Sequence, residues 1–351
     1  MTRRPLIARS NQVKSRFVRA VVLRELGAPA NLRVEEWPKP APGPGEVVVR
    51  VRAAALNHRD VWIRRGQYAG IRLPAILGSD AAGEVTSAGD DESSPWVDQE
   101  VVIDPSFGWG PDRRAQSSAF HLLGMPTEGT YAEFVKVPAA NVYPKPSHLT
   151  FEEAAALPLA AVTAYRALVT RAALQAEETV VITGIGGGVA VAALTIAVSL
   201  GATVYVTSGS EKKIATAKQH GAVDGALYHA DDWSRTLLAM IGRRPDVVVD
   251  GAGGDTLAQA LDLVRPGGRI VTYGATRGAI PNVEVRRIFW KQLDIHGSTM
   301  GTPDDFKRML ETYAKGLRPV VDTIVPLHQA ADAHARLESG EQFGKIVLRV
   351  G

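Results

Sequence analysis

One segment constrains the fold of this chain more than any other. Residues 179–183 (TVVIT) form an apolar, β-branched run that leads directly into a glycine-rich turn, 184–190 (GIGGGVA), and then into an Ala-rich helix. Glycines allow the backbone of such a turn to approach a ligand closely, and the N–H groups at the start of the helix attract an anion such as a pyrophosphate. The segment therefore predicts a dinucleotide-binding unit.

The context of this turn is more specific than its glycine spacing. A strict GxGxxG is absent, because Val189 holds the third position after Gly184 and Gly186, and the register that closes on Ala190 begins with Ile185. Alanine is an accepted variant at the third position. The alternative is a glycine-rich connection without a ligand. The expected backbone contacts of the dinucleotide are Gly184, Gly186, Gly187, Gly188 and Val189.

The segments around the turn indicate a parallel sheet. Apolar strands at 202–208, 246–251 and 269–274 alternate with helical segments at 211–221 and 232–241. Strands that are apolar throughout and are joined by helices are typical of a doubly wound α/β fold of the Rossmann type. Ligands of such sheets bind at the carboxyl ends of the strands. Candidate cofactor contacts there are Asp250, Gly251 and Gly274.

The end of the second strand indicates which dinucleotide binds. NAD-binding proteins place an acidic residue there, whereas this chain has Thr-Ser-Gly-Ser at 207–210, followed by Glu211, Lys212 and Lys213. Hydroxyl groups and lysines suit a 2′-phosphate. We expect NADPH rather than NADH, with Ser208 and Lys212 as contacts. Glu211 could still bind a ribose, and the lysines could form a solvated helix face.

The rest of the chain predicts a second, β-rich domain. Short strands are expected at 18–26, 46–56, 75–87, 100–104 and 131–137, and a helix at 151–168 opens with a capping box of Thr150 and Glu153. Late strands at 322–327 and 343–350 need a partner sheet and are expected to return to this first domain. The predicted division is a β-rich domain at 18–145 and 299–351 and a nucleotide-binding domain at 146–298.

Composition excludes several classes of protein. The 351 residues contain no cysteine, which removes disulfides, thiolate nucleophiles and zinc sites built with cysteine. No apolar run approaches the ~18–20 residues of a membrane helix, so we expect a cytoplasmic protein without membrane contact.

The net charge of +3 is concentrated at the amino terminus. Five basic residues and no acidic residue precede Phe17, so the rest of the chain is slightly negative. Residues 1–17 are expected to be a disordered extension before a natural start near Val18. A transit peptide or a nucleic-acid-binding arm is the alternative. The single aromatic residue there offers no stacking platform, so nucleic acid is not an expected partner.

Beyond these patterns, residues 18–350 resemble the medium-chain dehydrogenase/reductase superfamily, in particular its zinc-independent quinone oxidoreductase branch. The motifs that carry the resemblance are PGPGEVVVRVRAAALNHRD, LGSDAAGEV, EGTYAEFVKVP, LTFEEAAALPLAAVTAYRAL, VVVDGAGG, LVRPGGRIVTYGAT and FGKIVLRV. The resemblance implies a GroES-like catalytic domain beside a Rossmann domain, with the active site in the cleft between them. It also implies a homodimer that pairs through the strand of the segment RRIFWKQLDIHGSTMG.

The departures from the family concern zinc. Zinc-using members have a Cys where this chain has Asn57, and a His-Glu pair where it has Ser79 and Asp80. We therefore expect no zinc and no other metal, although His58, Asp60, Asp80 and His121 could in principle hold one. Residues 106–125, in place of a four-cysteine lobe, could cover the substrate cleft or form an ordinary surface loop.

Without a Lewis acid, conjugated carbonyls are the expected acceptors, because hydrogen-bond donors can stabilise the enolate charge that develops. The expected reaction is hydride transfer from NADPH to a quinone or an α,β-unsaturated carbonyl compound, followed by protonation from a tyrosine or water. The resemblance implies Asn57 and Tyr68 as catalytic residues. It implies further cofactor contacts at His58, Thr163, Tyr228, Phe343 and Lys345, each with a packing role as the alternative.

Two other functions stay open at the level of sequence. One is an alcohol dehydrogenase-like enzyme of the same superfamily. The other is a noncatalytic NADPH-binding protein that contacts RNA or a protein through the basic arm. The sequence does not identify the substrate.

Overall fold

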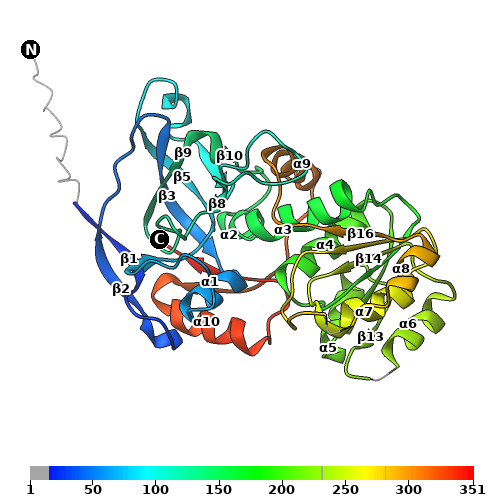
Figure 1. Ribbon diagram of the computed structural model, residues 1–351. Helices are drawn as coiled ribbons and strands as arrows, with labels where there is room; N and C mark the ends of the chain where they lie inside the picture. Colours follow the sequence, from blue (N-terminus) through cyan, green and yellow to red (C-terminus); the bar gives the residue numbers. More distant parts are fainter. Residues whose placement is uncertain (1–15, 231, 281) are drawn as a thin grey trace, which may run out of the picture.

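The computed structural model describes residues 16–230, 232–280 and 282–351. Figure 1 shows two parts side by side, a β-rich part made by the early and the last segments of the chain and an α/β part made by its middle. The predicted fold class, a doubly wound parallel sheet with a GroES-like β-rich domain, is confirmed. Most of the predicted basic extension, residues 1–15, lies outside the described residues. Phe17 already belongs to the first strand, one residue earlier than predicted.

The β-rich part is built on one large sheet with the strand order β10-β6-β5-β3-β18-β17. Its central strand β3 pairs antiparallel with β5, β9 and β18. The last strand of the chain thus lies beside a strand from its first sixth. The strands are β3 (Glu46–Ala55), β5 (Asp80–Ala88), β6 (Glu100–Ile103), β9 (Phe134–Pro138), β10 (Val142–Pro144), β17 (Val321–Pro326) and β18 (Lys345–Arg349).

Smaller elements surround this sheet. A three-stranded sheet has the order β2-β1-β4, and β7 pairs with β8. These strands are β1 (Phe17–Leu23), β2 (Leu32–Pro38), β4 (Ala75–Ile76), β7 (Ser106–Phe107) and β8 (His121–Leu122). Helices α1 (His58–Arg64) and α10 (Ala330–Ser339) contact each other beside the sheet. Short 3-10 turns lie at Pro29–Asn31, Ser94–Trp96, Ala139–Asn141 and Leu327–Gln329.

Two predicted elements are interrupted. The strand expected at 75–87 is divided into β4 and β5, because Gly78 has φ of +95° and a Cβ there would lie 2.5 Å from the Thr130 and Tyr131 side chains. The helix expected at 151–168 is divided into α2 (Phe151–Ala155), α3 (Pro158–Tyr165) and a π-helical turn (Arg166–Arg171). Pro158 lacks an N–H and so starts a new helix. The capping box of Thr150 and Glu153 is confirmed.

The α/β part has the predicted parallel sheet, in the order β13-β12-β11-β14-β15-β16. Its strands are β11 (Thr179–Ile182), β12 (Thr203–Ser208), β13 (Asp224–Leu227), β14 (Val247–Asp250), β15 (Arg269–Thr272) and β16 (Asp294–Gly297). Its helices are α4 (Gly188–Ser199), α5 (Glu211–Gln219), α6 (Trp233–Ile241), α7 (Gly254–Leu263) and α8 (Val285–Lys291), and α9 (Pro303–Tyr313) packs on α3.

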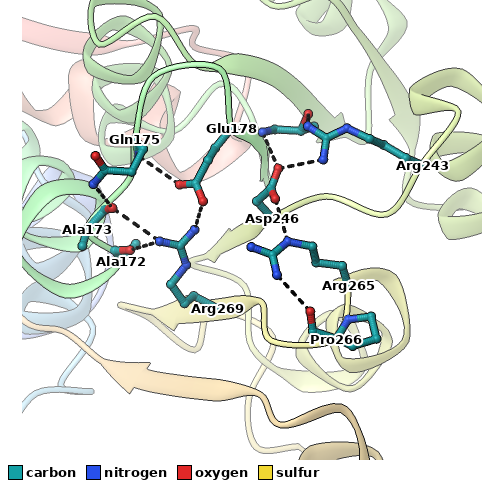
Figure 2. Close-up of polar contacts among 10 residues, drawn as sticks. Ala172, Ala173, Gln175, Glu178, Arg243, Asp246, Arg265, Pro266 and Arg269 are labelled. Carbon is teal, nitrogen blue, oxygen red and sulfur yellow. Dashed lines mark hydrogen bonds and ion pairs between the residues drawn. The ribbon is translucent and has the colours of Figure 1, made fainter.

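Ion pairs hold the amino-terminal edge of this sheet (Figure 2). Asp246 accepts hydrogen bonds from the first amide of β11 at 2.8 Å, from Arg243 at 3.0 Å and from Arg265 at 2.6 Å. Arg269 at the start of β15 pairs with Glu178 and donates to the backbone before β11. These charges fix the edge opposite the glycine turn, so the carboxyl ends of the strands are left to bind a ligand.

Candidate functional site

A cavity of about 880 Å³ lies where the β-rich and α/β parts meet. Its walls come from the start of α1, the turn between β11 and α4, the residues that follow β12, β14 and β15, and the start of β18. The carboxyl ends of the parallel strands therefore open into it, as the doubly wound fold requires of a ligand site.

The glycine turn forms the middle of the cavity wall. Gly184 and Gly186 have φ of +66° and +119°, a backbone region that side chains disfavour, and α4 begins directly after them. A Cβ on Gly186 would lie 2.7 Å from Cδ of Lys213, and one on Gly188 would lie 2.8 Å from Cδ of Lys345. A helix start that only glycines can form thus faces the cavity, which fits the pyrophosphate of a nicotinamide dinucleotide.

A buried polar cluster joins Asn57, Asp80 and Lys345. Nζ of Lys345 lies 2.6 Å from Oδ1 of Asn57 and 2.8 Å from Oδ2 of Asp80. Nδ2 of Asn57 donates to the same Asp80 oxygen at 2.9 Å, and the other oxygen accepts from the backbone N–H of Leu159 at 2.8 Å. All three side chains are buried, and Asn57 and Lys345 line the cavity. The cluster therefore presents an amide and an ammonium to a ligand.

This cluster does not fit a zinc ion. Asn57 and Asp80 stand at positions where the family resemblance places zinc ligands, and the ammonium of Lys345 is hydrogen-bonded to both. The third position, Ser79, accepts from Arg59 and donates to a backbone carbonyl. Within residues 16–230, 232–280 and 282–351, no three His, Cys, Asp or Glu side chains gather in a way that could hold a metal.

Lys213 and Lys345 give the part of the cavity around His58 a positive potential. The imidazole of His58 opens onto the cavity. Burial of the imidazole against the cavity walls is the largest cause that lowers the pKa of His58, and the charges of Lys345 and Lys213 lower it further. Lysine charges that disfavour protonation of His58 favour an anion at the same place. The position of His58 is therefore compatible with the phosphate contact that the family resemblance implies.

Polar and aromatic groups gather beyond β12. Ser208 and Tyr228 line the cavity as predicted contacts, together with Lys213. The ring of Tyr228 lies 4.5 Å from that of His229 and 5.7 Å from the guanidinium carbon of Arg277. His229 directly follows Tyr228 in the sequence, so its place in the site could have been predicted with that of Tyr228. Nothing in the sequence pattern indicates that Arg277 reaches this point.

Most predicted site residues line the cavity, and four do not. Lys212 is exposed on α5, whereas the next residue, Lys213, lines the cavity. The two lysines are adjacent on the helix, and the helix turns only the second of them toward the cavity. Gly186 is covered by Lys213, as the close approach described above requires.

Asp250 and Phe343 also lie behind the cavity wall. Asp250 is buried and accepts from Oγ1 of Thr183 at 2.6 Å and from the backbone N–H of Gly253 at 2.8 Å. Burial raises the pKa of Asp250. Phe343 stacks on His220 with ring centroids 5.7 Å apart. Predicted residues on the wall are Asn57, His58, Tyr68, Thr163, Gly184, Gly187, Gly188, Val189, Ser208, Tyr228, Gly251, Gly274 and Lys345.

The end of the cavity near α1 is more apolar. Trp62 and Leu122 line it with Met300, and Tyr68 lies with its ring 5.1 Å from the guanidinium carbon of Arg59. Leu122 belongs to the segment 106–125, which therefore borders the cavity through β8. This end has the space and the apolar surface to receive an organic acceptor.

Comparisons with known proteins agree with this architecture. A family model described as the GroES-like domain of alcohol dehydrogenases matches residues 43–147, and one described as zinc-binding dehydrogenase matches residues 188–315. A zinc-type alcohol dehydrogenase-like protein YogA from Leptosphaeria maculans is 35% identical over 89% of this chain and 92% of its own length.

Two further relatives cover nearly the whole chain. The human quinone oxidoreductase is 29% identical over 95% of this chain and 98% of its own length. A crystal structure titled NAD-dependent alcohol dehydrogenase superposes with a TM-score of 0.88 and 39% identity over 95% of this chain and all of that one. The chain belongs to the medium-chain dehydrogenase/reductase superfamily and is an oxidoreductase of that family.

Proposed function

We propose that this protein is an NADPH-dependent oxidoreductase that reduces quinones or α,β-unsaturated carbonyl compounds without a metal ion. The observation that carries the proposal is the ammonium of Lys345, which is hydrogen-bonded to Asn57 and Asp80 where zinc-using relatives hold their metal. A Zn²⁺ ion would have to displace the Lys345 ammonium from Asn57 and Asp80, and an amide with one carboxylate is not a usual set of zinc ligands. Acceptors that need no Lewis acid are therefore favoured.

The bound nicotinamide would supply a hydride to the acceptor. Asn57 is oriented for a part in this reaction, because its Oδ1 accepts from Lys345 and one N–H of Nδ2 donates to Asp80. An amide carries two N–H groups, so one remains to donate to the carbonyl oxygen of a substrate. Such a fixed donor stabilises negative charge as it develops on that oxygen.

Tyr68 is the proposed proton donor. Tyr68 lines the apolar end of the cavity beside Trp62, and this is the end that would hold the acceptor. Arg59 lies against the ring and restricts its position. A positioned acid of this kind typically contributes ~10²–10⁴-fold to a rate.

The preference for NADPH rests on the charge around β12. Lys213 and Arg277 both line this part of the cavity, with Ser210 at the start of α5. Among the described residues, no Asp or Glu side chain lines the cavity, and Glu211 is exposed outside it. An NAD-binding site would place a carboxylate on the ribose hydroxyls, whereas cations and hydroxyl groups suit a 2′-phosphate.

A homodimer is the proposed assembly. Strand β16 forms one edge of the parallel sheet, and Ile295 on this edge is 41% exposed. On the neighbouring helix α8, Phe289 and Trp290 are 61% and 83% exposed. A sheet edge with exposed apolar side chains beside it is covered in stable proteins, and pairing with a second copy would cover both.

The experiment that tests the function measures NADPH and NADH oxidation with quinones, enones, aldehydes and ketones, and the reverse reaction with alcohols. We expect turnover with the conjugated acceptors, with NADPH preferred. Turnover confined to simple alcohols and aldehydes would support the alcohol dehydrogenase-like alternative instead. The absence of turnover with every acceptor would leave the noncatalytic alternative.

In the described part of the chain, no helix combines the length and apolarity needed to cross a bilayer.

A further inference from the structure

Arg59 is a buried arginine whose charge is only partly matched. Three arginines are buried among the described residues: Arg59, Arg64 and Arg166. Arg64 pairs with Glu338 at 2.5 Å, and Arg166 pairs with Asp305 at 2.6 Å. The nearest carboxylate oxygen to Arg59 is Oδ1 of Asp60, at 3.9 Å, which is beyond hydrogen-bond distance.

Asp60 is held by other groups through one of its two oxygens. Its Oδ2 accepts from the backbone N–H of Asn57 at 2.9 Å and from the hydroxyl of Tyr131 at 3.0 Å. These bonds complete the capping box of α1 and hold Oδ1, which has no hydrogen-bond partner among the described residues, 3.9 Å from Nη1 of Arg59. Asp60 therefore offsets part of the charge of Arg59 and makes no hydrogen bond with it.

The guanidinium of Arg59 is nevertheless held in one orientation. Its Nη1 donates to Oγ of Ser79 at 2.6 Å and to the carbonyl oxygen of Leu123 at 2.9 Å. No group of the described protein accepts from Nε or from Nη2, and both atoms are buried. The N–H of Nε and one N–H of Nη2 point in the same direction, so the unpartnered atoms form the edge that binds a carboxylate through two parallel hydrogen bonds.

Arg59 borders the end of the cavity that would hold the acceptor, together with Trp62 and Tyr68. Arg59 follows Asn57 by two residues in the chain. The Tyr68 ring covers the guanidinium at 5.1 Å, and the glycines on either side of its segment, Gly66 and Gly70, have positive φ. Because Nε and Nη2 are buried, a carboxylate reaches them only when neighbouring side chains such as Tyr68 move.

We propose that Arg59 binds a carboxylate of the acceptor, so that the substrate is a conjugated carbonyl compound that also carries a carboxylate group. This inference rests on the proposed function and makes it narrower. Leaving a fixed, desolvated guanidinium edge without an acceptor is costly, and a ligand carboxylate satisfies both donors at once. Neutral acceptors of the same skeleton leave this edge unpaired and are expected to be poorer substrates.

The test compares 4-oxopent-2-enoate with its methyl ester, at saturating NADPH. We expect kcat/KM of the wild-type enzyme to be at least 10-fold higher for the acid, and the ratio to fall to about 1 in Arg59→Met. Arg59→Lys keeps the charge without the two-pronged edge, so it should restore only part of the ratio. Arg72→Met, at an exposed arginine outside the cavity, is the matched control and should keep the wild-type ratio.

A binding measurement separates this inference from the proposed function. The saturated acid 4-oxopentanoate cannot be reduced at a conjugated bond, and its Kd from calorimetry should rise at least 10-fold in Arg59→Met, with NADPH affinity and Tm as measures of folding. Equal Kd values in the wild type and a folded Arg59 variant would overturn the carboxylate site, even if enones are reduced. Loss of binding in that variant without reduction of any enone would retain the site and overturn the proposed function.

Discussion

The ammonium of Lys345 and the carboxylate of Asp80 form a buried ion pair, with 2.8 Å between Nζ and Oδ2, that joins the last strand of the chain to β5. Removal of the cation would leave the carboxylate buried beside Asn57 with its charge unmatched. We predict that Lys345→Met lowers the free energy of unfolding by about 3–5 kcal/mol. Urea unfolding measures this change.

The same pair predicts coupling between the two positions. In the double variant Asp80→Asn with Lys345→Met, neither charge is left alone, so part of the stability should return. Additive losses in the two single variants would show that the side chains stabilise the protein independently, contrary to our account.

Lys213 and Lys212 make a matched test of the cofactor. Lys213 lines the cavity over Gly186, whereas Lys212 is exposed. Lys213→Ala should raise KM for NADPH at least 10-fold and change KM for NADH much less, because only NADPH carries the 2′-phosphate. Lys212→Ala should have the smaller effect. Equal changes of KM for NADPH and NADH in Lys213→Ala would place its role at the pyrophosphate instead.

Replacement of the Tyr68 hydroxyl tests the proton donor. Tyr68→Phe keeps the ring on Arg59 and removes only the acid, so kcat for an enone should fall by roughly 10²-fold with little change in KM. The solvent isotope effect on kcat should rise in the variant if protonation becomes rate-limiting. An unchanged kcat would assign protonation to water.

The exposed side chains beside β16 predict the state of assembly. Trp290→Glu adds a charge at the proposed contact and should convert a dimer to a monomer in size-exclusion chromatography with light scattering. Met240→Glu, at an exposed apolar residue on α6, is the control and should leave the mass unchanged. A wild-type protein that is already monomeric would contradict the proposal.

Asp104 predicts a pH-dependent stability. It is buried, and burial raises its pKa to about 7. Because the folded state disfavours the charged form, the cost is absent below the ordinary pKa near 4, grows as the pH rises to about 7, and stays constant above it. Asp104→Asn should therefore stabilise the protein by about 1–4 kcal/mol at pH 8 and have little effect at pH 4.

Thermal melting at the two pH values measures this difference. The control is Asp91→Asn, at an exposed aspartate. A gain in Tm for Asp104→Asn that is equal at pH 4 and pH 8 would exclude titration of Asp104 as its cause.

The parts of the fold that local chemistry determines were predictable from the sequence. The turn at Gly184 and Gly186 has the positive φ angles that its glycines allow, and the capping box of Thr150 and Glu153 closes over one helical turn. A continuous helix was predicted through Pro158, and this prediction was wrong. The missing N–H of Pro158 was the sequence signal for the break.

The site depends on contacts that no local pattern encodes. Lys345 reaches Asn57 and Asp80 from nearly 300 and more than 260 residues away, because β18 returns to the sheet beside β3. Ser79 and the Leu123 carbonyl bind Arg59 through Nη1, and its Nε and Nη2 have no partner among the described residues. The family resemblance indicated which residues surround the cavity, and the structure adds which of their polar atoms are already used.

The most direct test of the central claim is NADPH-dependent reduction of a quinone by protein that has been stripped with a chelator and analysed for metals. The account predicts that kcat stays the same before stripping, after stripping and after addition of Zn²⁺, with far less than one metal ion per chain. Turnover that disappears with the metal and returns with one Zn²⁺ per chain would contradict it.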